Sequence, residues 1–310
     1  MPHGGAVQED PHGRPANLRL RLGASVAIAL GAAAVELFGG YLSGSLALLS
    51  DAGHVGTDAL ALGLTLWAMH VSARPHTPRL SFGYHRLEIL AAFLNALLLF
   101  GVAGYILFQA YQRALNPPAV LGSLMLTVAL LGLVANLTMI LLLRPWAKDN
   151  LNVQAAWLHV WSDTLGSVGV ILGGIVITLT GMGIVDVIAA VFVASLILFG
   201  AVRLVRDSVH IFLEGSPRAF TPQDVATAIR EEKAVREVHD LHVWTVTSGL
   251  YALSGHIVVD GSLSVDAASD LVRAIRERLS TRFGIAHATL QVDSMESGLI
   301  PEREIRSPEP

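Results

Sequence analysis

The sequence contains no cysteine, and charged side chains make up only 15% of its 310 residues. The lack of cysteine excludes disulfide bonds and thiolate metal sites. Soluble domains carry roughly 25% charged residues, whereas this chain is 53% hydrophobic and has a mean hydropathy of +0.56. The composition therefore predicts an integral membrane protein.

The scarce charges are unevenly distributed. Residues after position 206 carry 16 of the 25 acidic side chains and 10 of the 21 basic ones. About twenty polar residues precede the first apolar run, unlike the short basic start of a cleaved signal peptide. We therefore expect the first hydrophobic segment to be retained. A charge-poor membrane region should then be followed by a net acidic domain that resembles a soluble protein in composition.

Six apolar stretches are long enough to cross about 30 Å of hydrocarbon, for which roughly 20 helical residues suffice. They cover approximately residues 22–42, 47–70, 88–110, 120–143, 154–180 and 184–204. Basic residues gather in the N-terminal tail, in the second and fourth connections and after the sixth span, whereas the odd-numbered connections hold only Arg113. By the positive-inside rule, both termini are expected to be cytoplasmic.

The region after residue 206 alternates between helical and strand patterns. TPQDVATAIREEK predicts a helix that begins after the cap Thr221. VHDLHVWTV and LYALSGHIVVD alternate as two strands, SVDAASDLVRAIRERLSTRFG is an amphipathic helix that ends at a glycine, and ATLQVDS is a third strand. This αββαβ order predicts a small α+β sandwich with its helices on one face.

The predicted organisation therefore has four parts. They are a cytoplasmic N-terminal tail (1–20), an all-α six-helix transmembrane domain (21–206), a cytoplasmic α+β domain (207–296) and a disordered tail (297–310) rich in Pro, Glu and Arg. His3 and His12 in the first tail are expected to be solvated.

Ionisable residues recur at helical spacing inside two of the apolar stretches. His54 and Asp58 are four residues apart in SDAGHVGTD, and His159 and Asp163 repeat this spacing in LHVWSDTLG. Each pair shares one helix face, and two imidazoles with two carboxylates match the tetrahedral shell of zinc. A charge inside the membrane costs about 2.5–3.5 kcal/mol, so a shared divalent cation is the predicted compensation. Imidazole ligands favour Zn, Co or Ni over Mg or Ca.

Interhelical hydrogen bonding is the alternative role for polar residues inside a membrane. It stays open for the two pairs above, although two matching pairs are hard to ascribe to chance. For Asp51, three residues before His54, an accessory role at the metal site and a hydrogen-bonding role are equally open. Hydrogen bonding is favoured for Asn136. Glu36 and Asp186 lie toward the ends of their spans, where solvation suffices to explain them.

Four long stretches resemble signature sequences of the cation diffusion facilitators, most closely those of the zinc, cobalt and cadmium efflux branch. They are SLALLSDAGHVGTD, SFGYHRLEILAAFLNALLL, NLNVQAAWLHVWSDTLGSVGVI and VHDLHVWTVTSGLYALSGHIVVD, and the likeness extends from about residue 20 to 296. The resemblance implies a homodimer of six-helix protomers in the lipid bilayer, each with a ferredoxin-like cytoplasmic domain. It further implies export of divalent metal, most simply zinc, in exchange for protons, with neither an organic cofactor nor a nucleic acid partner. It assigns the transport site to His54, Asp58, His159 and Asp163.

The resemblance also implies sites outside the membrane. Cytoplasmic zinc sites of the family match His239, His256, His287 and Asp293, where half-exposed strand positions are the alternative explanation. Opposite charges match Arg86 and Glu214, which suggests an interlock that holds the dimer together. The connection RPWAKDNLNVQ lacks the long His-rich insertion of many eukaryotic relatives, and this favours a prokaryotic plasma membrane.

Two other classes of function remain open at this point. A membrane metalloenzyme needs an open metal position and a general base, but HExxH is absent and four ligands close the shell, so a transporter is predicted instead. A membrane-bound metal sensor or channel would bind metal in the cytoplasmic domain and use the spans only as a gate. Metal movement driven by a pH gradient would separate an antiporter from both.

Overall fold

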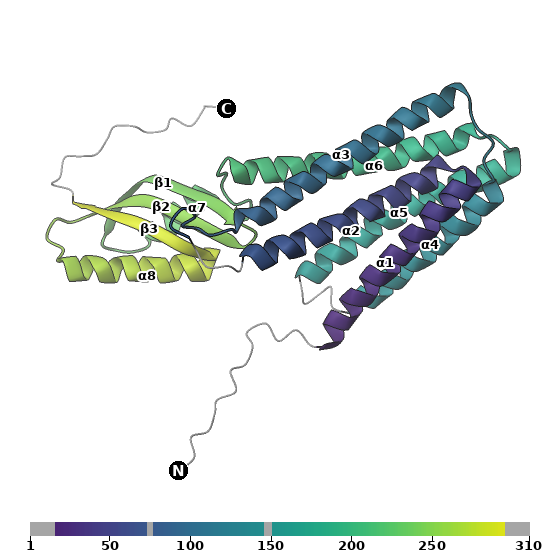
Figure 1. Ribbon diagram of the computed structural model, residues 1–310. Helices are drawn as coiled ribbons and strands as arrows, with labels where there is room; N and C mark the ends of the chain where they lie inside the picture. The colour runs from purple at the N-terminus through teal and green to yellow at the C-terminus, as the bar shows by residue number, and fades with distance from the viewer. Residues whose placement is uncertain (1–15, 73–76, 146–150, 295–310) are drawn as a thin grey trace, which may run out of the picture. The chain divides into compact units, whose positions relative to one another are not determined.

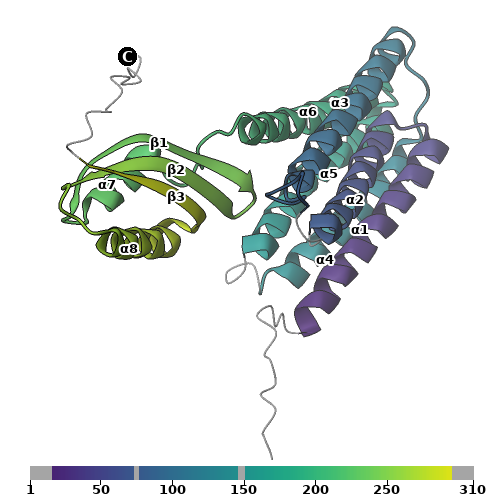
Figure 2. The same ribbon diagram turned by 60° about the vertical axis from the view of Figure 1, so that its left-hand side comes forward.

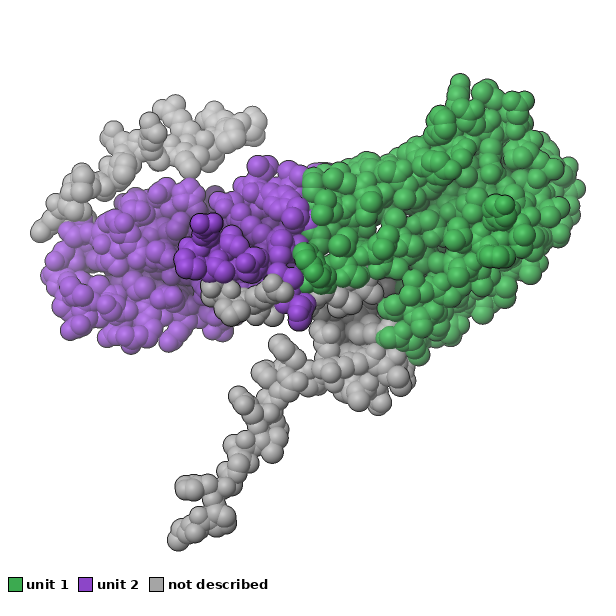
Figure 3. All heavy atoms as spheres, viewed as in Figure 1, with its two compact units in different colours: residues 1–67, 91–205 green, residues 68–90, 206–310 purple. Residues whose placement is uncertain are grey.

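The protein is described by a computed structural model over residues 16–72, 77–145 and 151–294, which includes all side chains except those of 16–22, 62, 65–66, 69 and 151–156. The predicted disordered tail (297–310) lies outside these residues, as does the predicted N-terminal tail up to the start of the first helix at Ala16. The chain forms two compact units, residues 1–67 with 91–205 and residues 68–90 with 206–310 (Figure 3).

Six long helices make up most of the first unit (Figure 1), and residues at one end of α2, α3 and α6 are counted with the second. They are α1 (Ala16–Ser43), α2 (Leu46–Ser72), α3 (Arg86–Leu115), α4 (Gly122–Leu143), α5 (Leu151–Thr180) and α6 (Ile184–Phe212). Within the described residues, five helical segments are long and apolar enough to cross a membrane, namely Gly23–Ser43, Arg86–Leu115, Gly122–Leu143, Trp157–Thr180 and Ile184–Phe212. This confirms a helical membrane domain. Because α2 is not among the five, the count of six spans stays a prediction.

Small residues allow α5 to pack closely against its neighbours. A Cβ atom on Gly173 would lie 3.3 Å from the Cβ of Ala189 in α6, and one on Gly174 would lie 3.3 Å from backbone atoms of Leu126 in α4. Close backbone approach of this kind is common where small residues line membrane helices. It brings the polar side chains of α5 within reach of those on other helices.

The second unit contains the predicted αββαβ order. Its elements are α7 (Pro222–Arg230), β1 (Val235–Thr247), β2 (Leu250–Val259), α8 (Val265–Phe283) and β3 (Ile285–Ser294). The predicted start of α7 is confirmed, because Thr221 and Asp224 form a reciprocal capping box with a proline at the first helical position. Gly284 ends α8 in the left-handed conformation, with φ of 69°.

A small mixed sheet carries the strands in the order β1-β2-β3 (Figure 2). β1 and β2 pair antiparallel, whereas β2 and β3 pair parallel across the α8 connection. Leu253 and Ile257 of β2 pack with Ile229 of α7 and Leu279 of α8 in one core. Because neighbouring strand residues point to opposite faces, His256 lies on the face that these helices leave uncovered.

Candidate metal centre

α2 and α5 bring the four predicted membrane ligands together in a ring. Asp58 Oδ2 lies 3.6 Å from His54 Nε2 and 3.0 Å from His159 Nε2. Asp163 Oδ1 lies 3.5 Å from His54 Nε2, and Asp163 Oδ2 lies 3.7 Å from His159 Nε2. The two imidazole rings meet edge to face with their centroids 6.0 Å apart. Each carboxylate thus contacts both histidines, so neither helix could form the ring alone.

The spacing of this ring is close to what zinc requires. Ligand atoms of a tetrahedral shell with bonds of about 2.0–2.2 Å lie about 3.3–3.6 Å apart, and the contacts above run from 3.0 to 3.7 Å. Asp163, however, offers a different oxygen to each histidine. Within the described part of the chain, only the cytoplasmic group discussed below has three single ligand atoms all within 4.8 Å of one another. Binding of one ion in the membrane would therefore draw the two histidines closer together.

Two buried atoms of the ring residues form no hydrogen bond in the part of the chain that the structure describes, although Asp163 Oδ1 lies 3.5 Å from His54 Nε2. Within the described residues, the buried atoms His54 Nδ1 and Asp163 Oδ1 have no hydrogen-bond partner. A buried polar atom left unpaired costs about 1–3 kcal/mol. The imidazole and carboxylate donors, together with an unpaired carboxylate oxygen, are therefore suited to a divalent cation such as zinc.

Asp51 and Asn136 lie beside the ring and do not belong to it. Asp51 is 5% exposed, and its Oδ2 accepts a hydrogen bond from the hydroxyl of Ser167, 3.4 Å away. Asn136 donates from its amide to the same hydroxyl at 3.2 Å. Asn136 thus forms the interhelical hydrogen bond expected of it. Ser167 also belongs to this network, although no sequence pattern pointed to it.

The expectation that Asp186 is solvated at a span end is wrong. Asp186 is 1% exposed and accepts hydrogen bonds from the hydroxyl of Ser45 at 2.6 Å and from the backbone N–H groups of Leu46 at 2.7 Å and Ala47 at 3.2 Å. Arg113 Nη1 lies 3.7 Å from Asp186 Oδ2 and donates a hydrogen bond to the carbonyl of Gly44. A carboxylate of α6 therefore caps the first turn of α2, where helices attract negative charge.

Glu36 is also buried, with 3% of its surface exposed, so the same expectation is wrong for it. Glu36 of α1 lies against Gly132 of α4, and a Cβ atom added to Gly132 would collide with Glu36 Oε1. Within the described residues, Glu36 Oε2 has no hydrogen-bond partner. Its sequence position gave no sign of this, because Gly132 lies almost a hundred residues further along the chain.

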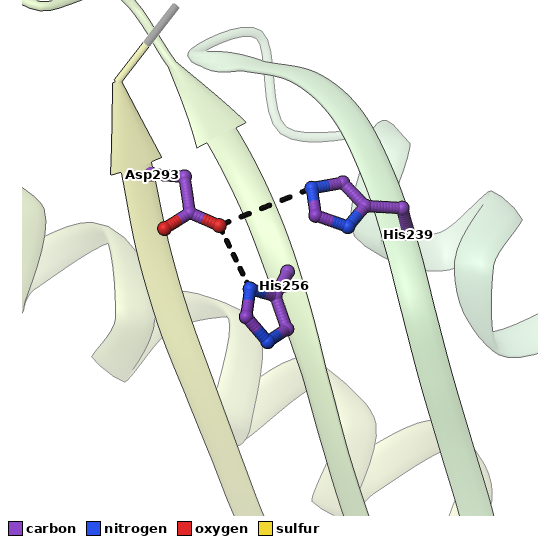
Figure 4. A group of neighbouring side chains, drawn as sticks. All are labelled: His239, His256 and Asp293. Atoms are coloured by element: carbon purple, nitrogen blue, oxygen red, sulfur yellow. Dashed lines mark hydrogen bonds and ion pairs between the residues drawn. The ribbon is translucent and has the colours of Figure 1, made fainter. Parts of the chain in front are cut away.

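A second ligand group occupies the uncovered face of the sheet (Figure 4). His256 Nδ1 lies 2.8 Å from Asp293 Oδ2, and His239 Nε2 lies 3.9 Å from the same oxygen. The two imidazoles stack with centroids 5.1 Å apart, since His239 and His256 are partners in the β1–β2 register. One ligand atom from each residue lies within 4.8 Å of the other two, so the group could hold a metal ion.

His287, the fourth residue predicted for this site, is not part of the group in one chain. Its ring makes an edge-to-face contact with Phe82, with centroids 5.9 Å apart. It lies on β3 opposite Ala252, six residues before Asp293. Register alone therefore separates it from the other three, and the structure brings together three of the four predicted ligands.

The surroundings of Asp293 favour the ionised form of its carboxylate. Gln291 donates a hydrogen bond to it at 2.9 Å, and His256 and His239 lie on its other side. These contacts lower the pKa of Asp293, although partial burial opposes the shift. Because the folded-state pKa is lowered, the stabilisation is present above the ordinary value for aspartate and is lost only as the pH falls through the lowered value. The carboxylate is therefore a charged ligand at neutral pH.

Replacing His256 by alanine is expected to lower zinc affinity at the cytoplasmic group by at least about 10-fold, because His256 contacts both other members. Zinc bound per chain can be measured on the full-length protein by calorimetry and metal analysis. His242→Ala is the matched control, since its exposed ring pairs with Asp240 and is not a member of the group. Unchanged zinc binding in His256→Ala would remove this group from the candidate sites.

Arg86 and Glu214 form an ion pair within one chain. Arg86 Nη2 lies 2.9 Å from Glu214 Oε1, and both side chains are well exposed. Glu88, two residues further into α3, accepts a hydrogen bond from Thr247 at the end of β1 at 2.7 Å. Both contacts lie within the second unit, to which the start of α3 belongs.

Comparison with known proteins gives matches to both parts of the chain. Residues 22–213 match the family model described as the cation efflux transmembrane domain, and residues 217–295 match the model described as the cation efflux protein, cytoplasmic domain.

Three bacterial relatives resemble the chain over most of its length. A "Cadmium, cobalt and zinc/H(+)-K(+) antiporter" of Bacillus subtilis is 41% identical over 262 residues, which is 84% of each chain. The "Metal cation efflux system protein CzcD" of Cupriavidus metallidurans is 39% identical over 93% of this chain and 90% of its own. The "Zinc transporter ZitB" of Escherichia coli is 41% identical over 84% of this chain and 82% of its own.

Proposed function

This chain belongs to the cation efflux family, and on that premise we propose that it exports zinc from the cytoplasm in exchange for protons. It is a metal cation efflux transporter of the membrane and not an enzyme. The observation that carries the finer proposal is the ring of two histidines and two aspartates, in which each carboxylate contacts both imidazoles. The bacterial relatives support a plasma membrane location, with both termini in the cytoplasm as the distribution of basic residues predicts.

The chemistry of the ligands links metal to protons. Zinc binds neutral imidazole and ionised carboxylate, so protons and metal compete for the same side chains. Imidazole groups in general have a pKa of about 6.5. A site open to the cytoplasm therefore tends to lose protons and take metal, whereas a site open to a more acidic exterior regains protons and releases metal. Alternation of the helices between two such exposures gives metal efflux driven by a proton gradient.

Potassium is the second candidate for the counter-ion. The Bacillus subtilis relative is named for exchange against both protons and potassium. Both ions carry a single positive charge, and either gradient could return charge to the cytoplasm as zinc leaves. Zinc uptake into proteoliposomes under a potassium gradient, compared with uptake under a pH gradient, distinguishes the two ions.

In the homodimer that we propose, zinc at His239, His256 and Asp293 would act as a regulatory ion. The three residues lie on the sheet face that α7 and α8 leave open (Figure 4). Metal bound there can favour closer association of the two cytoplasmic domains, which we expect to follow the ferredoxin-like pattern. His287, which lies outside the group in one chain, remains available to the partner.

Replacing Arg86 by glutamate is expected to weaken the dimer and slow transport if this pair serves as the charge interlock. The direct contribution of such an exposed pair is only about 0–1 kcal/mol, so the expected effect is a few-fold rise in the dimer dissociation constant, measured by light scattering. The charge exchange Arg86→Glu with Glu214→Arg should restore the wild-type value. The interlock is abandoned if Arg86→Glu changes neither dimerisation nor transport.

Proteoliposomes containing the full-length protein provide the test of the proposed function. Zinc uptake should depend on a pH gradient and should be reduced when that gradient is collapsed by an ionophore. A metal channel would move zinc down its own gradient without counter-ions, and a sensor would bind zinc without moving it. A panel of zinc, cobalt, cadmium and nickel then identifies the preferred ion.

A further inference from the structure

Two buried carboxylates lie next to the metal ring and belong to no part of it. Glu36 of α1 is 3% exposed and Asp51 of α2 is 5% exposed. Within the described residues, Glu36 Oε2 has no hydrogen-bond partner, and Asp51 accepts a single hydrogen bond, from the hydroxyl of Ser167 at 3.4 Å. A buried carboxylate normally has a cation or several donors against it. These two have neither, so they have unused capacity for a positively charged ligand.

The surrounding helices leave space for Glu36 and supply further oxygen atoms. Gly132 of α4 has no side chain at the place where the Glu36 carboxylate lies, since a Cβ atom there would collide with Glu36 Oε1. One turn along α4, Asn136 is hydrogen-bonded to Ser167 of α5. The atoms available to a cation are therefore carboxylate, amide and hydroxyl oxygens. Hard cations prefer such oxygens, whereas zinc prefers the imidazoles of the neighbouring ring.

The charged groups around this pair are nearly all acidic. Glu36 interacts electrostatically with Asp51 and with Asp163 of α5, and Asp51 interacts with Asp163 and with His54 on its own helix. On α4, the neighbouring residues Gly132 and Asn136 are uncharged. Within the described residues, no lysine or arginine forms an ion pair with Glu36 or Asp51. The described residues thus include no lysine or arginine paired with either carboxylate.

Charge counting shows that zinc alone cannot balance the acids in this part of the membrane. With neutral histidines, one Zn²⁺ balances Asp58 and Asp163 and leaves Glu36 and Asp51 as two further negative charges. Each uncompensated charge inside the membrane is energetically costly. Additional monovalent cations, which can be protons or metal ions, remove that cost.

We propose that Glu36 and Asp51 form a second binding site, for the monovalent counter-ion of transport, beside the zinc-binding ring. The proposal rests on the antiport function above and names the residues that hold the returning ion, a proton or a potassium ion. Ser167 connects the two sites, because its hydroxyl lies 3.4 Å from Asp51 Oδ2 and 3.3 Å from the backbone carbonyl of Asp163. Zinc in the ring therefore weakens the binding of the monovalent cation at the pair, and departure of zinc strengthens it.

The variants Glu36→Gln and Asp51→Asn test the site, because each removes one negative charge with little change in volume. Glu36→Asp is the matched control that keeps the carboxylate. Full-length protein in proteoliposomes is given a pH gradient in one arm and a potassium gradient in the other, and counter-ions moved per zinc are measured in each. We expect this ratio to fall by about one in the neutral variants and to be kept by Glu36→Asp. The arm in which the ratio falls identifies the ion.

A variant that no longer transports is tested at equilibrium in detergent. Zinc affinity of the wild-type protein should fall as the counter-ion concentration rises, and this dependence should be weaker in Glu36→Gln and Asp51→Asn. The second site is overturned if the neutral variants move as many counter-ions per zinc as the wild type. For a variant that no longer transports, it is overturned if zinc affinity depends on the counter-ion concentration as it does in the wild type. Wild-type protein that moves zinc without any counter-ion refutes the antiport function itself, and this result is obtained before any variant is compared.

Discussion

Replacing Asp163 by alanine is expected to abolish zinc transport and to lower zinc affinity in the membrane by at least about 100-fold. Loss of a residue that only supports a metal ligand costs about 10–100-fold in affinity, so loss of a ligand should cost at least the upper value. Asp163 contacts both histidines of the ring, at 3.5 and 3.7 Å, and its side chain is only 12% exposed. Without it, one charged donor is missing and the site carries one negative charge fewer against Zn²⁺.

The measurement is zinc uptake into proteoliposomes, combined with calorimetric zinc binding to the protein in detergent. Ser162→Ala is the matched control, because Ser162 precedes Asp163 on the same helix and is exposed. The control should transport at the wild-type rate. If Asp163→Ala transports as well as Ser162→Ala, the ring is not the transport site and the polar residues there serve only to hold the helices together.

Replacing Asp186 by alanine is expected to destabilise the membrane unit by roughly 3–5 kcal/mol, the cost of breaking a buried ion pair by removing one partner. The change leaves Arg113 without its carboxylate and removes the acceptor for Ser45 and for the first backbone N–H groups of α2. Because α2 carries two ligands of the ring, transport should decline as well. Asp186→Asn keeps an acceptor oxygen and should cost less than Asp186→Ala.

Unfolding of the purified protein in detergent, followed by circular dichroism, measures this loss. Asp207→Ala is the matched control on the same helix, since Asp207 forms a partly exposed ion pair with Arg218 and should contribute less than about 1 kcal/mol. A double-mutant cycle with Arg113→Ala then isolates the pairwise contribution. Equal stability of Asp186→Ala and Asp207→Ala would show that the cap does not stabilise α2.

The sequence by itself determined the features that depend on local spacing. His54 with Asp58 and His159 with Asp163 are each four residues apart, and a helix places such pairs on one face wherever it forms. The capping box at Thr221 and the alternation of the strands are equally local. Long apolar runs predicted the membrane helices, because the thickness of the bilayer sets the length of a helix that crosses it. For these features, neighbours in the chain are also the interaction partners.

Only the tertiary structure decided the features whose partners are far away in the chain. Asp186 changed from an expected solvated residue to a buried cap because Ser45, 141 residues earlier, lies against it. Glu36 is buried because Gly132 leaves room for it, and His287 is separated from His256 by the parallel register of β3. A lone carboxylate near a span end has the same sequence pattern whether water or another helix surrounds it. The packing of the helices and the strand register decide between these surroundings, because they determine which distant donors reach each side chain.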